Sequence, residues 1–161
     1  MKAAIIMGSD SDWPILKPAV KLLEEFGIGT EVIVASAHRT PAKVHDFVTT
    51  APDRGVRVFI AAAGAAAHLP GVVASLTTLP VIGVPINSTA LNGFDALLSI
   101  VQMPSGIPVG TMAVNGAKNA AIFAAQILGV ASSEVQEKLA VHRQAMIDEV
   151  EEKAAKVLAN Q

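Results

Sequence analysis

Apolar residues in this chain gather into five short runs, and the longer segments between the runs have helical periodicity. Each short run has the composition of a buried strand. We expect strands at Ala3–Met7, Glu31–Ala35, Val58–Ala62, Pro80–Val84 and Val109–Val114. Strands that alternate with helices in this way imply right-handed crossovers, and hence a parallel sheet with helices on both faces.

The segments between the runs supply the helices. After the first strand, one helical face carries only apolar residues, namely Ile15, Ala19, Leu22, Leu23 and Phe26. A second helix is expected to begin at Pro41, which suits a first helical turn, with Thr40 as its cap. Two more are expected at Gly93–Val101 and at about Lys118–Leu128.

The last segment, residues 133–160, is predicted to be one long helix. Ser133 and Gln136 resemble a capping box at its start. About 26 helical residues at about 1.5 Å each would extend about 39 Å, whereas a domain of this size has a radius of gyration of about 15 Å. We therefore expect the helix to overhang its own domain and to pack its apolar stripe on a neighbouring subunit.

Composition indicates one soluble domain. The chain has 161 residues, 52% of them hydrophobic, which is enough for a single α/β domain over residues 1–161 and too few for two. The net charge of −2, without a run of Lys or Arg, argues against nucleic-acid or membrane-surface partners. No apolar stretch is long enough to span a bilayer, the first strand leaves no room for a signal peptide, and there is no cysteine. We expect a cytoplasmic protein.

The distribution of charge predicts self-association. Between Val58 and Ala117 the only charged side chain is Asp95. A central sheet with buried connections accounts for part of this stretch. The remainder would leave a large apolar surface, which soluble monomers rarely expose, so we expect a homo-oligomer.

Two polar clusters directly follow the first two predicted strands. They are Ser9-Asp10-Ser11-Asp12-Trp13-Pro14 and Ser36-Ala37-His38-Arg39-Thr40-Pro41. Because ligands of open parallel sheets bind at the carboxyl ends of the strands, the two clusters are expected to form one site for a phosphorylated ligand. Helix capping by the Ser and Asp residues is the structural alternative.

Two histidines are candidates for chemistry at this site. His38 can exchange protons near neutral pH, and Arg39 can hold a phosphate or a carboxylate. His68 follows the third strand and is expected at the same sheet edge, after an Ala/Gly loop that either admits a ligand or packs tightly on the sheet. His45 and His142 lie on predicted helices and are interpreted as solvated or packing residues. Asn87, Ser88 and the turn at 102–106 are further candidates for closing the site, but their spacing is unspecific.

Four motifs together resemble the N5-carboxyaminoimidazole ribonucleotide mutase family of purine biosynthesis. They are Gly8-Ser9-Asp10-Ser11-Asp12-Trp13, Ser36-Ala37-His38-Arg39-Thr40-Pro41, Ala66-Ala67-His68-Leu69-Pro70-Gly71 and Ser99-Ile100-Val101-Gln102-Met103-Pro104. The resemblance implies a three-layer α/β/α flavodoxin-like fold with a five-stranded parallel sheet. It also implies an octamer completed by C-terminal helices. The implied activity is that of an isomerase of IMP biosynthesis, which shifts a carboxylate from N5 to C4 of an aminoimidazole ribonucleotide without metal or organic cofactor.

The resemblance also implies roles for individual residues. His38 is the expected general acid and base, and the loop that follows the third strand is expected to hold released CO2 while water is excluded. Phosphate binding is expected from Ser11, Ser36 and Arg39, ribose binding from Asp12, and contact with the migrating carboxylate from Ser9. The remaining substrate-binding residues implied are Ala63, Gly64, Ala65, His68 and Leu69.

This chain departs from the family pattern at Ala62 and Ala65, where the family usually has glycine, and at Ser105, where some members have arginine. Two alternatives to the mutase stay open. Related enzymes carboxylate aminoimidazole ribonucleotide with free CO2, although they depart from the first two motifs. A non-catalytic flavin- or phosphosugar-binding domain is the other, but flavin binders favour a stacked Trp or Tyr, and this chain has only Trp13.

Overall fold

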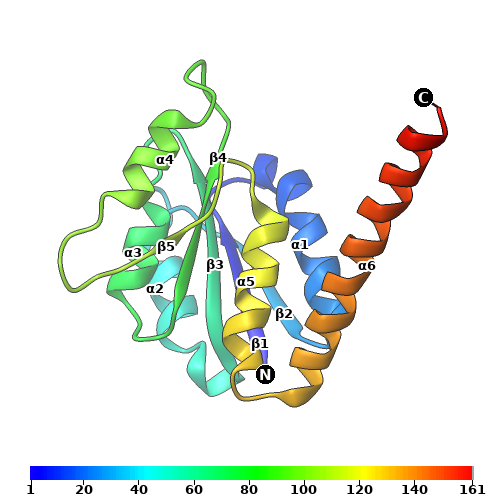
Figure 1. Cartoon of the computed structure of the whole chain (residues 1–161). Helices are drawn as coiled ribbons and strands as arrows, with labels where there is room; N and C mark the ends of the chain where they lie inside the picture. The colour runs from blue at the N-terminus through cyan, green and yellow to red at the C-terminus, as the bar shows by residue number, and fades with distance from the viewer. Residues whose placement is uncertain (161) are drawn as a thin grey trace.

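A five-stranded sheet forms the centre of the protein in the computed structural model, which describes residues 1–160. All paired strands are parallel, in the order β2-β1-β3-β4-β5. The strands are β1 (Lys2–Met7), β2 (Gly29–Val34), β3 (Val56–Gly64), β4 (Val81–Ile86) and β5 (Gly110–Thr111). This is the flavodoxin-like strand order, so the predicted fold class is confirmed (Figure 1).

Helices cover both faces of the sheet (Figure 1). One face packs against α1 (Trp13–Glu25) and α5 (Ala117–Gly129), and the other against α2 (Pro41–Thr49), α3 (Leu69–Ser75) and α4 (Phe94–Val101). Successive residues of β1 contribute to opposite cores, Ile5 to the first and Ile6 to the second. Burial on both faces is the physical reason why these strands have nearly continuous apolar sequences.

Two elements differ from the sequence prediction. β5 is shorter than the predicted run, because only Gly110 and Thr111 pair with β4 at this edge of the sheet. α3 was not predicted: it is a single short helix of 7 residues, with Pro70 in its first turn and no side chain that caps its start. Three of its first five residues are buried, and its Ala- and Val-rich sequence has no polar face. The sequence therefore lacks the alternation of apolar and polar positions that predicts a helix.

The long C-terminal helix is present as α6 (Ser133–Ala159). Its cap is Ser132 rather than the predicted Ser133: the Val135 N–H donates to the Ser132 hydroxyl oxygen at 3.4 Å. Ser132 and Ser133 are adjacent, so the sequence alone does not show which of them caps the helix. Ser132 is the cap because its backbone is extended, as a capping residue requires.

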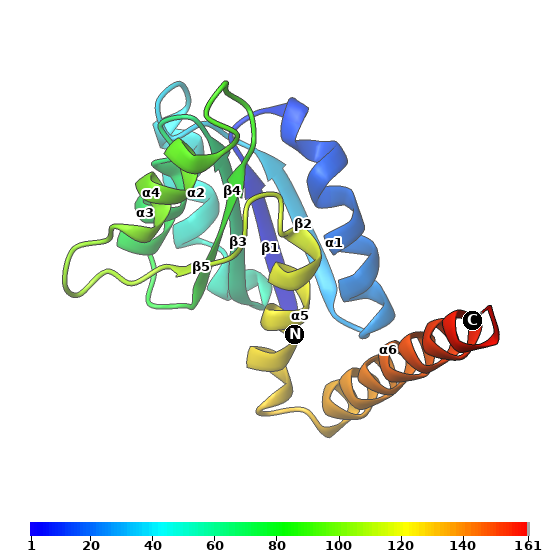
Figure 2. The same cartoon turned by 45° about the horizontal axis from the view of Figure 1, so that its top comes forward.

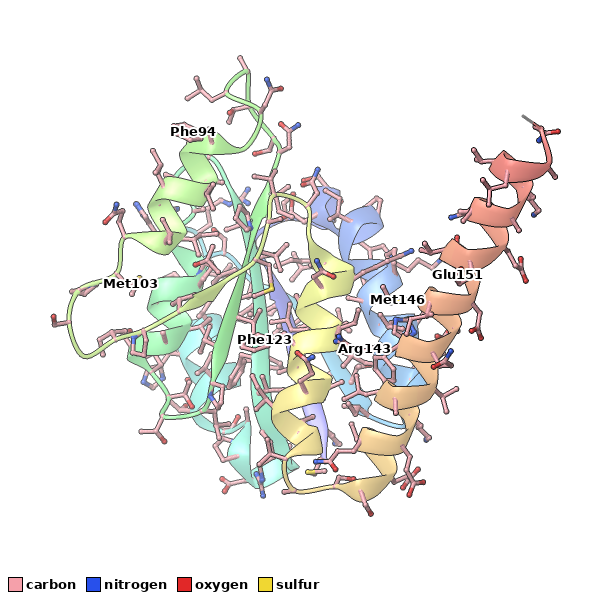
Figure 3. All side chains as sticks on the ribbon, in the orientation of Figure 1. Phe94, Met103, Phe123, Arg143, Met146 and Glu151 are labelled. Carbon is pink, nitrogen blue, oxygen red and sulfur yellow. The ribbon has the colours of Figure 1, made fainter. Side chains whose placement is uncertain are left out.

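α6 packs on α5 only at its start and then extends away from the sheet (Figures 1 and 2). Val135 is buried and Leu139 packs partly buried on the same core, whereas the large apolar residues from Val141 onward are half or more exposed. A groove of about 660 Å³ separates α6 from α5, and Arg143, Met146 and Glu151 lie along it (Figure 3). Within residues 1–160, none of the helices combines the length and apolarity needed to cross a membrane.

Candidate active site

The carboxyl ends of four strands surround one cavity of about 360 Å³. Since β1 lies between β2 and β3, the cavity occupies the point where the chain reverses its direction of winding, the place where doubly wound folds bind ligands. The two polar clusters that follow β1 and β2 therefore meet in space, as the sequence predicted. The lining residues are Gly8, Ser9, Ser11, Asp12, Ser36, Ala37, His38, Arg39, Ala63, Gly64, Ala66, Leu69 and Ser88.

The loop after β1 supplies hydroxyls and a buried carboxylate. It forms a short 3₁₀ turn, η1 (Asp10–Asp12), whose start Ser9 caps by accepting a hydrogen bond from the Ser11 N–H at 3.3 Å. The Ser11 hydroxyl lies 2.8 Å from the Ser9 hydroxyl and 3.3 Å from Oδ1 of Asp12, so its one proton is shared between two acceptors. Capping, the structural alternative, is thus realised by Ser9, which also lines the cavity together with Ser11 and Asp12.

Asp12 is a buried acid without a cationic partner. Its side chain is 5% exposed, and no ion pair within residues 1–160 involves it. Burial raises the pKa of the Asp12 carboxyl above its ordinary value, and the hydrogen bond from the Ser11 hydroxyl offsets part of that rise. A desolvated carboxylate in this position is a strong acceptor for ligand hydroxyls and would repel a phosphate.

The loop after β2 brings a cation to the cavity. The Arg39 guanidinium donates to the Gly8 carbonyl at 3.0 Å, which ties this loop to the loop after β1. Arg39 forms no ion pair in the part of the chain that the structure describes. Thr40 stands at the start of α2, but its side chain does not cap the helix as predicted, because its hydroxyl oxygen accepts from the Ser36 N–H at 2.9 Å. This bond holds the turn that presents His38 and Arg39.

A pair of histidines connects the loops after β2 and β3. Nε2 of His38 and Nδ1 of His68 lie 2.9 Å apart, and the rings meet edge to face with centroids separated by 5.0 Å. One ring donates and the other accepts this hydrogen bond. His38 lines the cavity, whereas His68 does not line it and contacts the site through His38.

The end of β3 and the loop after it form a wall of small residues. Ala63, Gly64 and Ala66 line the cavity, whereas Ala65 does not. Ala65 has a φ of 51°, in the left-handed region that favours glycine, and Ala62 is fully buried. A Cβ atom on Gly64 would lie only 2.0 Å from the Ser88 hydroxyl oxygen, so this loop approaches the end of β4 closely and only glycine fits at position 64.

Four lining residues were absent from the predicted set, namely Gly8, Ala37, Ala66 and Ser88. The first three are neighbours in the sequence of predicted site residues, so their place at the cavity follows from the prediction for those neighbours. Ser88 was considered for closing the site, but a Ser in an Asn-Ser-Thr sequence is equally typical of an ordinary turn.

The two other histidines have ordinary surroundings, as expected. His45 is exposed beside Asp46, and His142 packs edge to face on Phe26 with ring centroids 5.4 Å apart. Among residues 1–160, no three His, Asp or Glu side chains converge as metal ligands would.

Comparisons with known proteins relate the whole chain to one family. A family model described as AIR carboxylase matches residues 2–149. The N5-carboxyaminoimidazole ribonucleotide mutase of Pyrococcus horikoshii is 58% identical over 95% of this chain and 86% of its own length. The mutase of Thermotoga maritima is 54% identical over 97% of this chain and 91% of its own length.

Solved structures agree with these relatives. The crystal structure of Treponema denticola PurE superposes with a TM-score of 0.87 at 28% identity, and the match covers 96% of both chains. The family resemblance read from the four motifs is thereby confirmed. The chain belongs to the AIR carboxylase family, in which its curated relatives are N5-carboxyaminoimidazole ribonucleotide mutases.

Proposed function

We propose that this protein is an N5-carboxyaminoimidazole ribonucleotide mutase, an enzyme that moves a carboxylate from N5 to C4 of an aminoimidazole ribonucleotide in purine biosynthesis. Relatives of that name match nearly the whole chain at more than half identity. The observation that carries the proposal is the cavity in which the His38 ring, the Arg39 guanidinium and the Asp12 carboxylate meet a wall of small residues.

Different side chains of the loops after β1 and β2 bind different parts of the ribonucleotide. Arg39 binds the phosphate, since its guanidinium pairs with no carboxylate among residues 1–160 and can donate two parallel hydrogen bonds. Ser11 and Ser36 add hydroxyl donors. Asp12 accepts from the ribose hydroxyls, because a buried carboxylate repels phosphate but suits neutral donors. Ser9 is then left beside the base and its migrating carboxylate.

His38 performs the proton transfers. When the N5–carboxyl bond breaks, CO2 leaves and N5 takes a proton from His38. C4 then attacks CO2, and the proton that C4 carries returns to His38. One imidazole therefore serves as acid and then as base, and no proton is gained or lost overall.

The small-residue wall keeps CO2 beside the base between the two steps. Ala63, Gly64 and Ala66 leave room for a molecule of this size and offer no group that reacts with it. Exclusion of water at this wall prevents hydration and escape of CO2. Ala65 lies in the same loop, His68 contacts the site through its hydrogen bond to His38, and Leu69 lines the cavity at the start of α3.

The test follows both possible substrates, because the matching family model is described as a carboxylase. The purified protein is given either N5-carboxyaminoimidazole ribonucleotide or aminoimidazole ribonucleotide at low bicarbonate, and product formation is recorded. A mutase converts the first substrate rapidly and the second only as bicarbonate is added. Rapid conversion of the second substrate alone would contradict the proposal.

Substitution of His38 tests the assigned chemistry. His38→Asn is expected to lower kcat by a factor of about 10³ or more, the contribution of a positioned acid and base. Calorimetry with aminoimidazole ribonucleotide should show that binding persists. His45→Asn, on the exposed side of α2, is the matched control and should behave like the wild type.

The same proposal includes a cytoplasmic homo-octamer. Leu91, Phe94, Leu98 and Val101 expose apolar side chains along α4 and the loop before it, and Met146 and Val150 do so on α6. Contact with neighbouring subunits would remove both surfaces from water. Light scattering should give a mass about eight times the 16.6 kDa of one chain. A monomer at micromolar concentration would contradict this assembly. It would also contradict the packing of residues 133–160 on a neighbouring subunit, and residues 1–161 would then form a domain that is stable alone.

A further inference from the structure

The four loops around the cavity contribute unequally to its polar lining. The loops after β1 and β2 bring several hydroxyls, a carboxylate, an imidazole and a guanidinium. The loop after β3 lines the cavity with apolar side chains and glycine only, and the segment after β4 contributes a single residue, Ser88. Among the described residues that line the cavity, Ser88 therefore provides the only side-chain hydrogen-bonding group on the small-residue side, at the point where Gly64 lies against it.

Ser88 is held in place from both sides. The preceding N–H, of Asn87, donates to Oδ1 of Asn115 at 2.9 Å, which anchors the segment to the chain after β5. The following hydroxyl, of Thr89, donates to Oδ2 of Asp95 at 2.9 Å, which anchors it to the first turn of α4. Two side-chain hydrogen bonds on adjacent residues restrict the backbone of Ser88 far more than a free loop would be restricted.

The Ser88 hydroxyl itself is uncommitted. Within residues 1–160 its oxygen has no hydrogen-bond partner, and the side chain is exposed at the cavity. A Cβ atom added to Gly64 would lie only 2.0 Å from the Ser88 hydroxyl oxygen. The absence of a side chain at Gly64 thus makes room for this hydroxyl, which stands beside the wall assigned to CO2.

We propose that Ser88 is a further substrate-binding residue, whose hydroxyl donates a hydrogen bond to an oxygen of the migrating carboxyl group. The role rests on the mutase activity proposed above. The carboxyl group is an anion on N5 and on C4 but is neutral CO2 between them. A cation would bind the anionic forms much more tightly than the neutral one and would so oppose the formation of CO2. A neutral hydroxyl can donate to an oxygen of either form, and so holds the group beside C4 through both steps.

The experiment compares Ser88→Ala with Ser75→Ala. Ser75 lies at the end of α3, where its hydroxyl donates to the Val72 carbonyl at 2.7 Å, and it does not line the site. Each variant is supplied with N5-carboxyaminoimidazole ribonucleotide, and both the rearranged product and the released aminoimidazole ribonucleotide are quantified. For Ser88→Ala we expect kcat to fall about tenfold, because CO2 is no longer held beside C4, and the released fraction to rise severalfold. KM should rise, since the substrate carboxylate loses a donor, and the melting temperature should change little.

The outcomes are separable. Ser75→Ala should retain the wild-type rate and the wild-type product ratio. A Ser88→Ala variant with wild-type kcat and product ratio would overturn the assignment, and so would a lower kcat with an unchanged ratio, because a purely structural role slows turnover without releasing the intermediate. If the wild-type protein forms no rearranged product, the proposed function itself fails, and that result is distinct from any result of the Ser88 comparison.

Discussion

The two walls of the cavity are built on opposite principles. The loops after β1 and β2 act through side chains, with a buried acid at Asp12 and, at Arg39, a cation that has no acidic partner in the described part of the chain. The loop after β3 has almost no side chains and acts through the space that it leaves. The difference matches the two parts of the proposed substrate, because a ribose phosphate is held by charge and hydrogen bonds, whereas CO2 is held by shape and dryness.

After that of His38→Asn, the largest expected effect concerns the polar wall. Arg39→Ala removes a charged donor from the phosphate, and we expect KM to rise about 100-fold, as for the loss of one to two hydrogen bonds to a charged group. Lys43→Ala is the matched control, since Lys43 lies nearby at the start of α2 but donates to the Val34 carbonyl and does not line the cavity. Steady-state kinetics of both variants checks the prediction, and equal effects at the two positions would contradict it.

Gly64→Ala probes the small-residue wall. The added methyl group meets Ser88 and the Ile86 carbonyl, so we expect kcat to fall at least tenfold with little change in KM, and the free energy of unfolding to fall by about 1–3 kcal/mol. Urea denaturation and kinetics measure the two effects.

The double variant Gly64→Ala/Ser88→Gly separates the two effects. Removal of the Ser88 side chain relieves the clash, so most of the lost stability should return. The activity should stay low, because the Ser88 hydroxyl is then absent. Recovery of activity in the double variant would show that steric fit alone matters at this wall.

Asp12 should reveal a conflict between stability and function. Since burial raises its pKa in the folded state, the charged form is disfavoured by folding, and protein stability should increase as the pH falls through that pKa. Asp12→Asn is therefore expected to add roughly 0.5–2 kcal/mol to the free energy of unfolding at neutral pH, while ribonucleotide binding weakens. The stability difference should shrink in acid. A difference that is independent of pH would contradict the desolvated carboxylate.

The smallest effect is expected at Ala65. Its positive φ suits glycine, so Ala65→Gly should raise the free energy of unfolding by up to about 1 kcal/mol and leave activity unchanged. The neighbouring Ala66, which has no positive φ, is the control: Ala66→Gly should lower stability by about 0.5–1 kcal/mol. Thermal melts of the two variants should shift in opposite directions.

The sequence determined the layout of the fold. The apolar runs at β1, β3 and β4 were visible because both faces of these strands are buried, so almost every position is apolar. The clusters around Ser9 and His38 were predicted to meet because the carboxyl ends of parallel strands share one sheet edge. These inferences needed only local patterns and the rules of parallel sheets.

Contacts between loops were decided by the tertiary structure alone. The hydrogen bond between His38 and His68, the approach of Ser88 to Gly64, and the choice of Ser132 as the cap of α6 depend on where separate segments are placed to within an ångström. Sequence patterns report which residues are buried and which elements they form. They do not report how far a loop leans toward its neighbour, because that distance results from the packing of all the elements beneath it.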